Sequence, residues 1–151
     1  MSNEKNFKKI FLGGSIGRVP DKVAAYLDGF MDDGAHFLIG GDCDGADLAL
    51  QNYLHSKGYE NVTVFCSGEE CRFNVGGWEE RPVPASEDAD GTEFWRKKDK
   101  LMVDECHGGL FMWDTHSIGT RLNRMDLKRL GKPIFTYRST TDEFKITRRT
   151  K

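Results

Sequence analysis

Short apolar segments alternate with longer segments of helical pattern along most of the chain, and few folds can accommodate this order. The apolar segments are 9–12, 36–39, 61–66, 110–113 and 134–137. Between them, apolar residues recur at helical spacing in 21–33, 44–57, 92–106 and 117–130. Strands that alternate with helices form crossover connections, which produce a parallel sheet covered on both faces. The sequence therefore predicts an α/β protein with a mostly parallel sheet of about five strands.

The length of the chain, 151 residues, is sufficient for one domain with a substantial core, and we expect a single domain over 1–151. The alternation breaks at about 67–91, where glycines, prolines and the acidic run 87–90 predict a long loop. A loop of this length inside a compact domain is either disordered or functional, for example as a lid over a site. From about residue 140 the chain is polar, and we expect a peripheral tail.

Charge and hydropathy exclude several classes of protein. The net charge of −2 provides no basic field that would attract nucleic acid, so we do not expect a nucleic-acid partner. No apolar run reaches the length that spans a membrane, and the segment 2–5 lacks the apolar core of a signal peptide. We therefore expect a cytoplasmic protein with no membrane partner.

The four cysteines, Cys43, Cys66, Cys71 and Cys106, are scattered and form no C-x-x-C pair. In a cytoplasmic chain of this size we expect reduced thiols rather than a disulfide framework. A zinc site from three of these cysteines and His107 would match no common ligand spacing, so we expect no metal.

Three of the predicted strands end in glycine-rich or polar turns that lead into a helix. These turns are Gly13-Gly14-Ser15, Gly40-Gly41-Asp42 followed by Asp47, and the segment from Asp114 through Ser117, Gly119 and Thr120. Ligands of open parallel sheets bind outside the carboxyl ends of the strands, so the three turns should face one ligand. Glycine lets a ligand approach the backbone, and a helix N-terminus with hydroxyl groups suits a phosphate.

Familiar nucleotide-binding and hydrolase motifs are absent from the sequence. The chain has no G-x-x-x-x-G-K-[ST] loop, and Gly13-Gly14-Ser15-Ile16-Gly17 has the wrong spacing for G-x-G-x-x-G. A G-x-S-x-G elbow is also absent. These absences argue against a P-loop NTPase, a standard dinucleotide dehydrogenase and an α/β-hydrolase.

The glycine turns resemble those of the SLOG superfamily of Rossmann-like domains. The motifs that carry the resemblance are Gly13-Gly14-Ser15, Gly40-Gly41-x-x-x-Gly45-Ala46-Asp47, Ser117-x-Gly119-Thr120 and Gly131-Lys132-Pro133-Ile134, with Lys98-Asp99-x-x-Met102 similar to an Arg-Asn-x-x-Met element. The superfamily includes the DNA-processing protein Smf and the Lonely Guy phosphoribohydrolases, and the nucleoside 2-deoxyribosyltransferases have a related layout. The resemblance spans about 10–137 and implies a Rossmann-like three-layer sandwich that binds a nucleotide or nucleotide-sugar-derived ligand. It implies a phosphate near Ser117, Gly119 and Thr120.

From these motifs we expect the ligand to contact a set of residues at the carboxyl ends of the strands. They are Gly13, Gly14, Ser15, Gly40, Gly41, Asp42, Asp47, Asp114, Ser117, Gly119, Thr120 and Arg121. We expect no further cofactor. Because related domains often pair through helices, we also expect a homo-oligomer.

The sequence departs from the enzymes of these families at the position where they carry a catalytic glutamate. Asn123 occupies that position, and an amide is neither a nucleophile nor a general base. Arg121 and Arg124 beside it favour holding a phosphate. Asp114 and Asp42 are the candidates for a displaced catalytic carboxylate. We therefore expect a binding protein, a sensor or a specialised enzyme, with an N-glycosidic-bond enzyme as the alternative; a nucleic-acid module like Smf is disfavoured by the charge.

Overall fold

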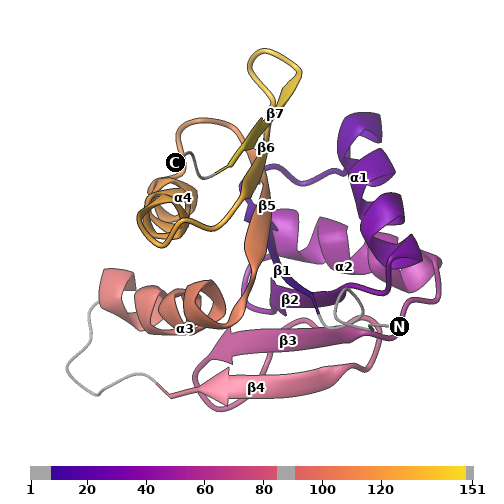
Figure 1. Ribbon diagram of the computed structural model, residues 1–151. Helices are drawn as coiled ribbons and strands as arrows, with labels where there is room; N and C mark the ends of the chain where they lie inside the picture. The colour runs from indigo at the N-terminus through magenta and orange to yellow at the C-terminus, as the bar shows by residue number, and fades with distance from the viewer. Residues whose placement is uncertain (1–7, 85–90, 149–151) are drawn as a thin grey trace, which may run out of the picture.

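The computed structural model describes residues 8–84 and 91–148, with side chains from residue 96 onward in the second range. Within these ranges, seven strands form one sheet (Figure 1). The strands are β1 (Lys9–Gly14), β2 (His36–Gly40), β3 (Val62–Ser67), β4 (Glu79–Val83), β5 (Gly108–Trp113), β6 (Ile134–Arg138) and β7 (Glu143–Thr147). The helices are α1 (Asp21–Asp32), α2 (Ala46–Ser56), α3 (Gly91–Glu105) and α4 (Ile118–Arg129).

The strands are ordered β4-β3-β2-β1-β5-β6-β7, and every neighbouring pair is parallel except β6 and β7. The predicted α/β class and mostly parallel sheet are confirmed. From β1 the chain builds the sheet outward in one direction as far as β4, and then returns to place β5 on the other side of β1. The strand order therefore reverses between β1 and β5, where open sheets of this kind have their ligand crevice.

The sheet has more strands than the five that we predicted. β4 lies within the segment 67–91 that we interpreted as one long loop, and β7 lies in the segment that we interpreted as a polar tail. Both are edge strands, which need a partner on one side only and therefore tolerate charges and proline. Pro82 sits in β4, opposite Cys66 of β3. The acidic run 87–90 lies outside the described residues.

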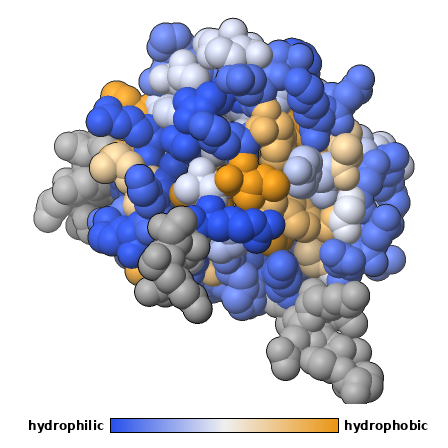
Figure 2. Space-filling model, turned by 45° about the horizontal axis from the view of Figure 1, so that its top comes forward, coloured by the Kyte–Doolittle hydropathy of each residue, from blue (hydrophilic) through white to orange (hydrophobic). Residues whose placement is uncertain are grey.

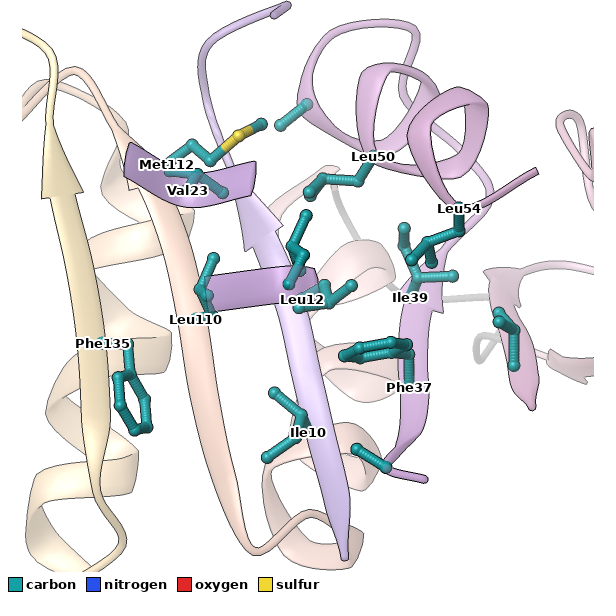
Figure 3. Packing of buried hydrophobic residues seen from close by; sticks show 14 of the residues in the cluster. Ile10, Leu12, Val23, Phe37, Ile39, Leu50, Leu54, Leu110, Met112 and Phe135 are labelled. Carbon is teal, nitrogen blue, oxygen red and sulfur yellow. The ribbon is translucent and has the colours of Figure 1, made fainter. Parts of the chain in front are cut away.

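Alternate residues of the strands enter two separate cores. Ile10 and Leu12 of β1 point to the face covered by α1 and α2 (Figure 3), whereas Phe11 points to the face covered by α3 and α4. Leu50 of α2 and Met102 of α3, both fully buried, close the two cores. This three-layer arrangement follows from the near-continuous apolar sequence of the central strands, which have to be covered on both faces.

The surface is mostly hydrophilic on the face that Figure 2 shows, where a small hydrophobic patch is surrounded by polar residues. Among the described helices, none combines the length and the apolar character that a membrane crossing requires. Ile118 and Met125 of α4 are the most exposed large apolar side chains among the described residues.

Gly14 allows β1 and β5 to approach each other at the strand-order reversal. Its φ is 142°, and a Cβ at this position would overlap the backbone of Met112. Replacing Gly14 by alanine should lower the free energy of unfolding by about 3 kcal/mol, because the backbone on both sides of the clash is held in the sheet. Urea unfolding would measure the change.

Gly29 of α1 provides the matched control, since a Cβ there meets no atom within 4 Å. Gly29→Ala should raise the free energy of unfolding by about 0.5–1 kcal/mol through helix propensity. Equal tolerance of both substitutions would contradict the close approach of β1 and β5.

Candidate functional site

A pocket of about 120 Å³ lies at the carboxyl ends of β1 and β2, beneath the N-terminus of α4 and against one side of α3. Seven residues from the predicted turns line it: Gly13, Gly14, Gly40, Asp47, Ser117, Gly119 and Thr120. These residues come from three turns that are far apart in the sequence. The structure therefore brings the three turns together around one cavity.

The N-terminus of α4 forms one wall of this pocket. Ser117 is the N-cap, and its side chain accepts a hydrogen bond from the amide of Thr120 at 3.3 Å. The first backbone hydrogen bond of the helix runs from the amide of Arg121 to the carbonyl of Ser117, so the amides of Ile118 and Gly119 precede it. Amides in the first turn carry the positive end of the helix dipole. This wall can therefore hold an anion.

Asp114 and Ser15 do not line the pocket but set the position of this wall. One oxygen of Asp114 accepts hydrogen bonds from the amides of His116 (2.8 Å) and Ser117 (3.1 Å). The hydroxyl of Ser15 accepts a hydrogen bond from the amide of Asp114 at 2.9 Å. The His116 amide is the main reason why the pKa of Asp114 is lowered. Asp114 is therefore a structural residue of the turn, and the interpretation of it as a ligand contact finds no support in this geometry.

Three other residues from the predicted set also lie away from the cavity. Gly41 faces the opposite direction, because a Cβ there would meet the carbonyl oxygen of Phe73 at 2.7 Å. Asp42 is buried and accepts hydrogen bonds from the amide of Ser67 at 2.8 Å and from Lys98. Arg121 is exposed on the outer side of α4. Neither catalytic candidate, Asp42 or Asp114, lines the pocket.

A buried lysine organises the acidic wall of the pocket. The ammonium nitrogen of Lys98 lies 3.3 Å from a carboxylate oxygen of Asp42 and 3.6 Å from one of Asp99. A Cβ on Gly40 would lie 2.5 Å from a carboxylate oxygen of Asp47 and 3.1 Å from the same nitrogen, so both charged groups lie close to the backbone of Gly40. Burial lowers the pKa of Lys98, but the carboxylates of Asp99, Asp47 and Asp42 outweigh this effect, and the net pKa is raised. Lys98 therefore stays charged.

Asp47 is the carboxylate in the pocket whose ionisation is most perturbed. Burial raises its pKa to about 6, with Lys98 opposing the shift and Asp99 adding to it. A carboxyl group with this pKa exchanges a proton near neutral pH, which the ordinary carboxyl group does not do. The candidate general acid or base in this pocket is therefore Asp47.

Asn123 connects the two helices that flank the pocket. Its amide nitrogen donates to Asp99 at 3.1 Å, and its amide oxygen accepts from Arg96 at 2.5 Å. Arg96 also pairs with Asp126 of α4 at 2.6 Å. Asn123 lies in the pocket wall, so the position at which the enzymes with similar motifs carry a glutamate faces the cavity.

Six further residues that were not predicted as ligand contacts line the pocket: Phe11, Cys43, Lys98, Asp99, Met102 and Asn123. Asn123 was singled out only as the residue at the position of the catalytic glutamate. Lys98, Asp99 and Met102 entered only through the similarity to the Arg-Asn-x-x-Met element. Their spacing of i, i+1 and i+4 places a charged pair beside an apolar residue on one side of α3. A lysine and an aspartate next to the buried apolar residues of a helix could therefore have indicated a charged pocket beside α3.

The expectation of four reduced cysteines is wrong for two of them. Cys66 and Cys71 form a disulfide, whereas Cys43 and Cys106 are free thiols. The expectation failed because the sequence does not show that the chain turns back after β3. This turn brings Cys71 within a Cα–Cα distance of 5.2 Å from Cys66. No cluster of three His, Cys, Asp or Glu side chains able to hold a metal occurs within the described ranges.

Trp78, which lies between the disulfide segment and β4, is a structural residue. Its indole nitrogen donates to the carbonyl of Tyr59 at 2.9 Å, and its ring packs into the core beneath α2. It lines a different depression, together with His55 and Tyr59.

Comparisons of the chain with protein-family models, with curated proteins and with solved structures gave no match. The similarity to the SLOG superfamily therefore stays a prediction from the motifs.

The raised pKa of Asp47 predicts a pH-dependent stability. Its pKa of about 6 in the folded protein lies above the ordinary value of 3.8, so the folded protein binds this proton more tightly than the unfolded chain. The contribution of Asp47 to stability should therefore grow as the pH falls through about 6 toward 4 and be lost as the pH rises. Asp47→Asn should raise the free energy of unfolding by about 1–2 kcal/mol at about pH 7.5 and by progressively less below pH 6.

Asp44→Asn is the matched control, because Asp44 belongs to the same turn and is exposed. It should leave the stability profile unchanged. Parallel profiles for wild type and Asp47→Asn between about pH 4 and 7.5 would show that the pKa of Asp47 is not raised.

Proposed function

We propose that this protein binds a phosphorylated, nucleotide-like small molecule in the pocket between α3 and α4. The observation that carries the proposal is the convergence of three glycine or serine turns on one cavity at the strand-order reversal. Each turn alone is weak support, because strand-to-helix turns often contain glycine. Three of them around one cavity favour a ligand held by the backbone.

The N-terminus of α4 is the proposed contact for the phosphate. Gly119 has no atom within 4 Å of where its Cβ would lie, so space remains in front of the first-turn amides. The hydroxyl of Ser117 donates to that of Thr120 at 3.3 Å, which leaves the Thr120 hydroxyl as a further donor at the same place. Backbone amides and hydroxyls at a helix N-terminus bind phosphate without requiring a basic side chain.

The opposite wall is suited to the neutral, hydroxyl-bearing part of the ligand. Asp47 and Asp99 present carboxylate oxygens to the cavity, and Lys98 is already paired with carboxylates. Carboxylates accept hydrogen bonds from sugar hydroxyls, but they repel additional phosphates. The charge distribution therefore favours a ligand with one phosphate, such as a nucleoside monophosphate or a phosphorylated sugar.

Gly119→Asp tests the proposed phosphate contact without disturbing the fold. An acidic residue in the first turn of a helix is favourable for the helix, and its carboxylate would occupy the space in front of the amides. The thermal stabilisation that AMP gives to the wild-type protein should disappear, with affinity at least about tenfold weaker. Differential scanning fluorimetry and calorimetric titration would measure both.

Gly29→Asp makes the same change on α1, away from the pocket, and should leave the response to AMP intact. If Gly119→Asp binds AMP as tightly as the wild type, the phosphate does not bind at this helix terminus. If the wild type responds neither to nucleoside monophosphates nor to phosphorylated sugars, the proposed function fails.

The raised pKa of Asp47 favours a second candidate function, cleavage of an N-glycosidic bond. In this reaction Asp47 would take a proton from water while the water oxygen bonds to the anomeric carbon. The carbon–nitrogen bond would break with its electron pair moving to the base, which then takes up a proton. Asp47 would thus take the role of the catalytic glutamate, whose position is occupied here by Asn123.

Release of free base distinguishes the two functions. If the protein is an enzyme, Asp47→Asn should reduce base release by at least about a hundredfold while AMP binding persists. Asp44→Asn should retain the wild-type rate. Absence of base release from nucleotides and deoxynucleosides that nevertheless bind would leave a binding protein.

A further inference from the structure

The Cys66–Cys71 disulfide joins the end of β3 to a segment that crosses the carboxyl ends of the strands. Cys66 is fully buried and Cys71 is partly exposed, and their Cα atoms are 5.2 Å apart. The bond encloses four residues. Short loops contribute little to the stabilisation that a disulfide provides, so the effect of this one is local.

The segment after the disulfide packs directly on the turn that follows β2. The amide of Phe73 donates to the carbonyl of Gly41 at 2.9 Å. The side chain of Gln51 donates both to the carbonyl of Gly40 (2.9 Å) and to that of Phe73 (3.1 Å). Cys71 lies against the same turn, because a Cβ on Gly41 would be 3.4 Å from the Cβ of Cys71. The disulfide thus restrains this segment in contact with the Gly40–Asp42 turn.

A second connection runs through β3 into the pocket wall. The amide of Ser67, the residue next to Cys66, donates to Asp42 at 2.8 Å. The same oxygen of Asp42 receives the ammonium group of Lys98 at 3.3 Å. Gly40 and Lys98 both line the pocket. Both routes from the disulfide therefore end at residues of the cavity.

We propose that Cys66 and Cys71 form a reversible redox site that controls the affinity of the pocket. In the oxidised form the segment 67–73 holds the Gly40–Asp42 turn and, through Asp42, Lys98. In the reduced form this segment is released and the acidic wall loses its support. The proposal concerns the pocket described above, and its binding part rests on the proposed function.

The reductant in this proposal is a dithiol. One thiolate of the dithiol attacks Cys71, the partly exposed sulfur, and forms a mixed disulfide while Cys66 leaves as a thiolate and takes up a proton. The second thiol of the reductant then attacks the mixed disulfide and releases Cys71 as a thiol. Two electrons pass to the protein, and the reductant becomes a cyclic disulfide.

The first experiment counts thiols in full-length protein purified in the absence of reductant. Alkylation under denaturing conditions should label Cys43 and Cys106 only, and labelling after treatment with dithiothreitol should reach all four cysteines. Labelling of all four before reduction, or failure to reoxidise, would overturn the proposal.

The second experiment compares hydrogen exchange in the oxidised and reduced proteins, with no ligand present. The amides of Ser67 and Phe73 should exchange at least about tenfold faster after reduction. Without the disulfide, their hydrogen bonds to the carboxylate of Asp42 and the carbonyl of Gly41 should open more often. Amides of α1 such as that of Leu27 should not change. Cys71→Ser should reproduce the reduced profile, and Cys106→Ser, which alters a distant thiol, should keep the wild-type response. Identical exchange in both forms would overturn the proposal.

Binding of AMP then separates this proposal from the proposed function. Weakening by about tenfold or more on reduction supports the redox control. Equal AMP affinity in both forms overturns it and leaves the binding function intact. If neither form binds AMP or a phosphorylated sugar, the function fails, and the exchange experiment alone decides whether reduction releases the segment.

Discussion

Helices that cover both faces of a parallel sheet cannot close the crevice where the strand order reverses, and this constraint places the candidate site. Here the reversal separates β1 from β5. The chain leaves β1 toward α1 and leaves β5 toward α4, on opposite faces, so the ends of these strands stay uncovered. Glycines at the end of β1 and the serine-capped N-terminus of α4 then line the cavity.

The acidic wall of the pocket depends on one buried ammonium group. Lys98 reaches from α3 to Asp42 at the end of β2, and Asp42 in turn binds the amide at the end of β3. Removing one partner of a buried ion pair leaves the other uncompensated, which costs about 3–5 kcal/mol. The cluster thus ties a helix to the ends of two strands. Burial is the main reason why the pKa of Asp47 in this cluster is raised to about 6; Lys98 opposes the shift, and the neighbouring carboxylates of Asp99 and Asp42 add to it.

Much of the fold could be predicted because the central strands and their helices carry strong periodic patterns. β4 and β7 were not predicted. Each is an edge strand of five residues, and polar residues together with Pro82 in β4, and Glu143 and Lys145 in β7, made these segments resemble loop. Seven of the residues predicted from the glycine turns line the pocket. The sequence could not predict which residues of a turn face the cavity. Gly40 and Gly41 are adjacent, yet Gly40 lines the cavity and Gly41 faces Phe73. Asp42 and Asp114 do not line the pocket, and their oxygens accept hydrogen bonds from backbone amides, which the sequence alone does not reveal.

The central claim is that separate turns hold one ligand together, and an amide titration tests it most directly. AMP would be added to isotopically labelled protein while the amide signals of Gly14, Gly40, Gly119 and Thr120 are followed. The account predicts that signals from all three turns shift along one binding curve with a single Kd. Shifts confined to one turn, or shifts that lie elsewhere on the molecule, would contradict it.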